Sequence, residues 1–153
     1  MTINYIIERK IQMLDRNELL GDCLYYSVNK LSRNIGKIAD EEFRITGLSP
    51  TYAFLVSIVN ECNGIAQKEI GEVLDVAPST ITRFIDKLEN SGHLERRIEG
   101  KNSFIYPTEK GKAIQKDINR AWSNLHAIYK DYIGEEECKN LTKILNDTCA
   151  KLK

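Results

Sequence analysis

The stretch that decides the fold is residues 65–97, which read IAQKEIGEVLDVAPSTITRFIDKLENSGHLERR. Its apolar residues recur at helical spacing and predict one helix over residues 66–74 and a second over residues 78–91. Asp75 lies in the short turn between them, where an aspartate tolerates a left-handed backbone conformation, and Gly92 ends the second helix. Two short helices joined by a turn of about three to four residues form the helix-turn-helix pattern.

The second of these helices has an apolar face and a polar face. Its inner stripe consists of Ile81, Ile85 and Leu88, and its outer face carries Ser79, Thr82, Arg83 and Asp86. Small hydroxyl side chains near the start of a helix let its backbone approach DNA, and an arginine can read guanine edges in the major groove. Gly71, on the first helix, is expected to leave space where the two helices cross.

The periodicity changes after Gly92. Residues 94–97 and 103–106 can each form a short strand, and residues 99–102 between them supply turn chemistry, so residues 94–107 predict a β-hairpin. Residues 76–102 contain five basic and four acidic side chains, a net charge of only +1. For DNA binding, the positions of the basic side chains therefore matter more than the total charge, because phosphate contacts depend on where Lys and Arg lie.

Helical periodicity dominates the flanks. The sequence predicts a short N-terminal helix over residues 3–14, a longer helix over residues 17–44, a helix starting at Ser49-Pro50, a long helix from Thr108 to Ile133, and a last helix over residues 135–152. The long apolar stripe from Ile114 to Tyr132 exceeds what a small domain can cover, which predicts a homodimer.

The composition excludes several classes of protein. The chain has 153 residues with no net charge, and 42% of them are hydrophobic. No apolar stretch is long enough to span a membrane, and the charged N-terminus does not resemble a signal peptide, so we expect a cytoplasmic protein. The four cysteines form no CxxC pair, and neither His93 nor His126 has a partner at metal-ligand spacing. No nucleophile signature or phosphate loop appears, so we expect neither an enzyme nor a metal or cofactor site.

Three segments together carry a resemblance to a known family. Residues 48–59 (LSPTYAFLVSIV), the stretch 65–97 and residues 106–114 (YPTEKGKAI) resemble the MarR family of regulators. The resemblance implies a mainly α fold with a small β-hairpin, in which a winged helix-turn-helix core at residues 47–112 is flanked by dimerisation helices at residues 1–46 and 113–153. It also implies that residues 78–91 enter the major groove of a palindromic operator, that the hairpin reaches a minor groove, and that a small-molecule or oxidant effector often controls binding.

The chain departs from the family pattern in three places. Ala66 stands where a capping Thr or Ser is usual, with Glu69 completing a capping box, so Asn63 or Gly64 is an alternative cap. Asp75 replaces the usual turn glycine. The wing is short, with IEGKNS at residues 98–103, and Lys101 is the candidate for the role of the family's wing arginine.

The predicted DNA-contacting residues lie on both helices of the motif and on the hairpin: Lys68, Pro78, Ser79, Thr80, Thr82, Arg83, Lys87, Arg96, Arg97, Lys101 and Asn102. The alternatives are an interior salt bridge for Arg83, a functionless hairpin tip for Lys101 and Asn102, and solvated surface for Lys68. Because neighbours in a strand point to opposite faces, only one of Arg96 and Arg97 should affect DNA binding.

Two further hypotheses concern regulation. Tyr25, Tyr26, Tyr52 and Trp122 can line an effector pocket, although core packing is the alternative. Cys23 lies near two tyrosines, as reactive cysteines do in peroxide-sensing relatives, and its alternative is a small core residue. The function predicted from the sequence is a sequence-specific transcription regulator, expected to act as a repressor. The alternative is a winged protein-interaction module that does not bind DNA.

Overall fold

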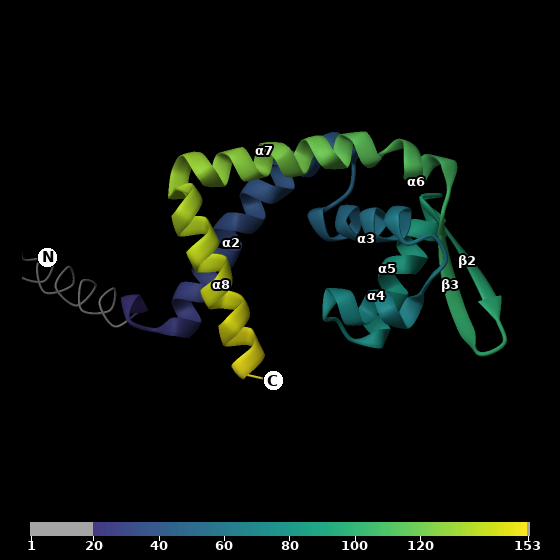
Figure 1. Ribbon diagram of the computed structural model, residues 1–153, viewed down its shortest axis with the longest axis horizontal. Helices are drawn as coiled ribbons and strands as arrows, with labels where there is room; N and C mark the ends of the chain where they lie inside the picture. The colour runs from purple at the N-terminus through teal and green to yellow at the C-terminus, as the bar shows by residue number, and fades with distance from the viewer. Residues whose placement is uncertain (1–19, 153) are drawn as a thin grey trace, which may run out of the picture. The chain divides into compact units, whose positions relative to one another are not determined.

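The computed structural model describes residues 20–152, which fall into two compact units that divide after Ala39. In chain order the elements are α2 (Leu24–Phe43), η1 (Arg44–Thr46), α3 (Pro50–Glu61), β1 (Ile65–Ala66), α4 (Gln67–Leu74), α5 (Pro78–Asn90), β2 (Leu94–Glu99), β3 (Asn102–Pro107), α6 (Glu109–Ala113), α7 (Gln115–Ile133) and α8 (Glu135–Lys151). Figure 1 shows their course. This architecture confirms the expected fold class, mainly α with a small antiparallel sheet in a winged helix-turn-helix.

The predicted N-terminal helix at residues 3–14 lies outside the described residues. The predicted helix over residues 17–44 is interrupted in its described part, because α2 begins only at Leu24. The carbonyl of Cys23 accepts the first bond of α2, from the amide of Ser27 at 2.9 Å. Gly21 and Asp22 are poor helix formers, which explains why the helix is interrupted just before Cys23.

The sheet has three antiparallel strands in the order β1-β3-β2. The predicted hairpin is confirmed, with Arg96 opposite Ile105 and Glu99 opposite Asn102, so that the loop at its tip consists of Gly100 and Lys101. Gly100 has φ of 63°, a conformation that suits glycine in such a turn. The two-residue strand β1 was not predicted. It pairs with β3, with Ile65 opposite Ile105.

The turn between α4 and α5 has the predicted conformation. Asp75 adopts φ of 53° and ψ of 47°, and among the described residues no other non-glycine has a positive φ. The amide of Val76 donates to the carbonyl of Gly71 at 3.1 Å, which closes the turn. Gly71 is buried beside Ile81, where a Cβ would make ordinary contact at 3.6 Å. The crossing of the two helices therefore does not require glycine there.

The long helix predicted from Thr108 to Ile133 is divided into α6 and α7 at Ile114. Thr108 caps α6 as predicted, since its hydroxyl oxygen accepts from the amide of Gly111 at 3.0 Å. The side-chain amide of Asn60 donates to the carbonyl of Gly111 at 2.9 Å. In an unbroken helix that carbonyl would accept the amide of Gln115, so a side chain from α3 competes with the helix at the break.

The core of the larger unit lies between α3, α5, the sheet and α7. Its fully buried side chains include Leu55, Val59, Ile70, Ile85, Leu88, Ile105 and Ile118. Trp122 on α7 meets Phe43 edge to face, with ring centres 4.6 Å apart. This core fixes α5 and the hairpin relative to each other, which is what a composite binding surface requires.

Candidate nucleic-acid interface

Helix α5 presents its polar face to solvent. Ile81, Ile85 and Leu88 are buried beneath it, and Pro78, Ser79, Arg83 and Lys87 are exposed. Proline at the first helical position costs no hydrogen bond, and the helix begins there, with Ala77 as the N-cap residue. The predicted stripe of apolar residues therefore orients the helix, and it leaves the small hydroxyl and the two cations outward.

The hydroxyl of Thr82 is already engaged. It donates to the carbonyl of Pro78 at 2.9 Å and accepts from the side-chain amide of Gln67 at 2.9 Å. Its single proton is therefore not available to a phosphate in this structure. Gln67, at the first position of α4, was not singled out in the sequence, and its hydrogen bond ties α4 to α5 across the motif.

Arg83 and Lys87 differ in their surroundings. Arg83 is exposed, and none of the ion pairs of the described residues involves it, so the interior salt bridge considered for it is not what the structure shows. The ammonium of Lys87 lies 4.7 Å from the centre of the Tyr52 ring, a cation–π arrangement. Arg83 is thus the more available of the two for an external partner.

The hairpin separates its two adjacent arginines. Arg97 is 55% exposed, donates to Glu95 at 2.9 Å and lies 4.3 Å from the centre of the Tyr106 ring. The hydrogen bond and charge of Glu95 raise the pKa of Arg97 above its usual value, so this side chain stays charged. Arg96 turns to the other face, where its guanidinium contacts Asp86 on α5. The expected opposite orientation is what the structure shows.

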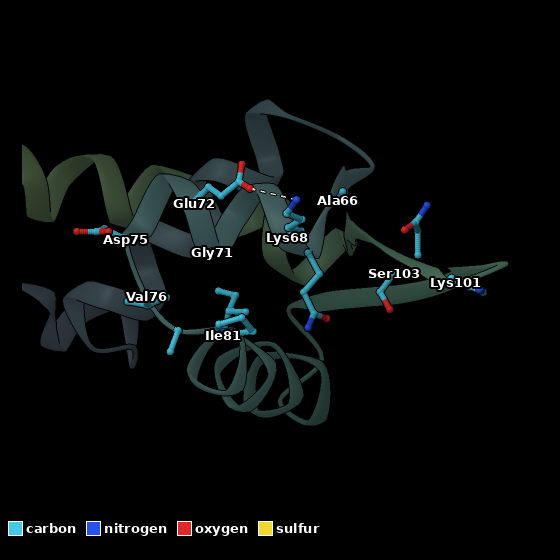
Figure 2. A pocket seen from close by; sticks show the side chains of 13 residues that line it. Ala66, Lys68, Gly71, Glu72, Asp75, Val76, Ile81, Lys101 and Ser103 are labelled. Atoms are coloured by element: carbon cyan, nitrogen blue, oxygen red, sulfur yellow. Dashed lines mark ion pairs between the residues drawn. The ribbon is translucent and has the colours of Figure 1, made fainter. Parts of the chain in front are cut away.

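A groove lies between α4, the turn that follows it, the start of α5 and the tip of the hairpin (Figure 2). Figure 2 shows Lys68 on α4, joined to Glu72 by an ion pair of 3.6 Å, and Lys101 and Ser103 on the hairpin across from it. Asn102 also lines the groove. The structure thus brings the predicted contacts of the first helix and the wing to the two sides of one open groove.

The residues predicted for regulation are distributed over the two units, and each unit is described by itself. Tyr52 packs edge to face on Phe84, with ring centres 5.2 Å apart, and Trp122 packs on Phe43 and Phe54. Tyr25 and Tyr26 belong to the other unit. Cys23 is a half-buried free thiol just before α2. The effector pocket and the redox role both stay predictions.

Residues 20–152 contain neither a candidate metal site nor a candidate membrane-spanning helix. No cluster of potential ligand side chains in this part of the chain could hold a metal ion. None of its helices is long and apolar enough to cross a membrane.

The chain is similar to a family model, to a named relative and to solved structures of transcription regulators. The model of the MarR family matches residues 48–102. The chain is 28% identical over 123 residues to the HTH-type transcriptional regulator YybA of Bacillus subtilis, itself uncharacterized, covering 78% of this chain and 81% of that protein. The solved structure of the transcriptional regulator SlyA is 26% identical, with a TM-score of 0.70 over 84% of this chain and 93% of that one. A mutant MarR from E. coli complexed with operator DNA is 18% identical, with a TM-score of 0.75 over 86% of this chain and 96% of that one, a likeness of fold alone.

Proposed function

We propose that this chain, which matches the model of the MarR family over residues 48–102, is a member of that family and a sequence-specific DNA-binding regulator of transcription. It acts as a homodimer on palindromic operator DNA and represses the genes whose operators it covers. The two relatives named above, YybA and SlyA, are both described as transcriptional regulators. A small-molecule or oxidant effector belongs to the same proposal, supported at present by the family alone.

One observation carries the proposal. Arg83 lies exposed on α5, about one turn after the exposed Ser79, while the opposite face of the same helix is buried in the core. A major groove admits an α-helix, and an arginine near the helix start can contact guanine through two hydrogen bonds. The wing carries two further cations, Arg97 and Lys101, and both are exposed. These cations would neutralise phosphates, a term that does not depend on sequence.

Arg83→Ala tests the proposal. It should weaken binding to a duplex selected by the wild-type protein from random-sequence DNA by about 1–3 kcal/mol, the scale of one good base contact. The melting temperature should stay unchanged, because the side chain is exposed. Fluorescence anisotropy measures the affinity, and circular dichroism measures the melting temperature.

Lys116→Ala is the matched control, since it removes one exposed positive charge on α7, outside the helix-turn-helix and the wing. Its DNA affinity should equal that of the wild type. If the wild-type protein selects no duplex and shows no salt-dependent DNA binding, the protein-interaction module is the better description.

A further inference from the structure

Arg96 occupies an unusual position for a cation next to a DNA-binding helix. Its Nη2 atom forms an ion pair with Asp86 and lies 3.8 Å from Glu89 Oε2, both on α5. Its backbone amide donates to Glu89 Oε1 at 3.3 Å. The side chain is only 20% exposed. The hairpin strand β2 is therefore joined to α5 through one arginine and two carboxylates.

The guanidinium has no other hydrogen-bond or ion-pair partner among the described residues. Its Nε atom is buried and finds no hydrogen-bond acceptor within this part of the chain. The charge of Arg96 therefore acts within the protein mainly on the carboxylates of Asp86 and Glu89. A guanidinium turned inward in this way is not placed to contact a phosphate.

The two carboxylates are unfavourable on a DNA-binding surface, because they carry the same negative charge as the DNA phosphates. Asp86 is 48% exposed and Glu89 is 39% exposed, and both belong to the helix that carries Arg83. Asp86 follows Arg83 by three residues, so the two side chains lie on neighbouring positions of the helix surface. Unneutralised carboxylates at that position would repel DNA phosphates, because partly buried charges are screened weakly by salt.

We propose that Arg96 is a positioning residue for DNA binding. Its single positive charge offsets part of the negative charge of Asp86 and Glu89 on α5, and it holds β2 against that helix without itself contacting DNA. The proposal rests on the proposed function, and it removes Arg96 from the direct contacts that the sequence suggested. Arg97, on the opposite face of the same strand, is the contact residue of the pair.

A double-mutant cycle separates this role from a direct contact. The probe is a fluorescein-labelled duplex that the wild-type protein selects from random-sequence DNA. Arg96→Met should weaken binding roughly tenfold in the wild-type background. In the Asp86→Asn/Glu89→Gln background the same change should alter affinity less than about twofold, because the carboxylates that it exposes are gone. Arg96→Lys, which keeps the charge, should recover part of the wild-type affinity.

Arg97→Met is the matched control, since it removes the same kind of side chain one residue away. It should weaken binding by the same factor in both backgrounds. Circular dichroism and the melting temperature identify variants that do not fold. If Arg96→Met does not fold, Arg96→Gln, which also removes the charge, takes its place in the cycle.

Each outcome decides the question. An equal loss for Arg96→Met in both backgrounds would identify a direct DNA contact and overturn the proposal. A lower melting temperature with unchanged affinity would identify a purely structural ion pair and overturn it as well. Failure of the wild-type protein to bind any duplex would instead reject the proposed function on which the inference rests.

Discussion

At the scale of single residues, Gly111 shows how a backbone contact can forbid a side chain. A Cβ at this buried position would overlap the carbonyl oxygen of His93. A carbonyl fixed by its own hydrogen bond from Thr108 cannot move aside as the end of a flexible side chain would. Gly111→Ala should therefore lower the free energy of unfolding by about 1–3 kcal/mol, measured by urea denaturation.

Gly71→Ala is the control for this prediction, because Gly71 is also a buried glycine within a helix. Its added Cβ would lie 3.6 Å from Ile81 Cγ2, an ordinary contact. Alanine favours helix over glycine by roughly 0.5–1 kcal/mol, so this variant should be at least as stable as the wild type. Equal destabilisation by the two substitutions would show that steric overlap is not the cause.

His93 makes stability depend on pH. Its burial and, to a lesser extent, the positive charge of Lys110 lower its pKa below the ordinary value of 6.5. Its Nδ1 atom lies 2.7 Å from the Ser91 hydroxyl oxygen. The unfolded chain binds a proton at this histidine below about pH 6.5, whereas folded His93 binds it only at a lower pH. The free energy of unfolding therefore has its full value above about pH 6.5 and decreases as the pH falls from there to the pKa of folded His93.

The measurement is the free energy of unfolding between about pH 8 and about pH 5. The wild-type value should fall as the pH drops through this range, and His93→Gln should reduce the fall. His126→Gln, which removes an exposed imidazole, should retain it. Identical pH profiles for the wild type and His93→Gln would contradict the assignment.

At the scale of elements, the start of α4 is only half capped. Ala66 is the N-cap residue, with φ of −67° and ψ of 137°. Its amide donates to the Glu69 carboxylate at 3.2 Å, but the side chain of Ala66 has no oxygen to accept the amide of Glu69 in return. Neither Asn63 nor Gly64 takes over the cap, contrary to the alternative drawn from the sequence. The capping box of this helix therefore lacks one of its two hydrogen bonds.

Ala66→Thr should complete the box and raise the free energy of unfolding by about 1 kcal/mol. Its hydroxyl oxygen would accept the amide of Glu69, and the backbone at residue 66 already has the extended conformation of an N-cap. Ala66→Val adds the same bulk without the hydroxyl and serves as control. A gain of the same size from valine would mean that β-propensity in β1, and not capping, causes the effect.

The elements that the sequence predicted have periodic patterns or strong end signals. The helix-turn-helix, the hairpin and the left-handed turn at Asp75 were all predicted from local sequence, because each depends on local chemistry. The strand β1 was missed because two residues have no periodicity, and its pairing partner Ile105 is distant in the chain. The division at Ile114 was missed because its cause is a side chain from α3, Asn60. The roles of Gln67 and Arg96 likewise depend on contacts between elements.

At the scale of the whole molecule, each unit exposes large apolar side chains. On α2, Leu24 is 69% exposed and Val28 is 42% exposed. In the larger unit, Tyr132 is 86% exposed and Ile144 is 61% exposed, and no residue of α8 is buried. Where such side chains gather into one patch, they usually mark a protein interface. A second copy of the chain is the partner that the family predicts.

Dimer formation should therefore make the melting temperature rise with protein concentration, because association stabilises the folded state by mass action. Ile144→Glu should place a charge in the interface and raise the dimer dissociation constant by roughly tenfold or more, measured by sedimentation equilibrium. Val73→Glu provides the control, since Val73 is equally apolar and 60% exposed but lies on α4 in the winged region. A wild-type protein that sediments as a folded monomer at micromolar concentration would show that α8 does not form an interface. Equal weakening by Val73→Glu would place the interface elsewhere, because the two substitutions differ only in which surface receives the charge.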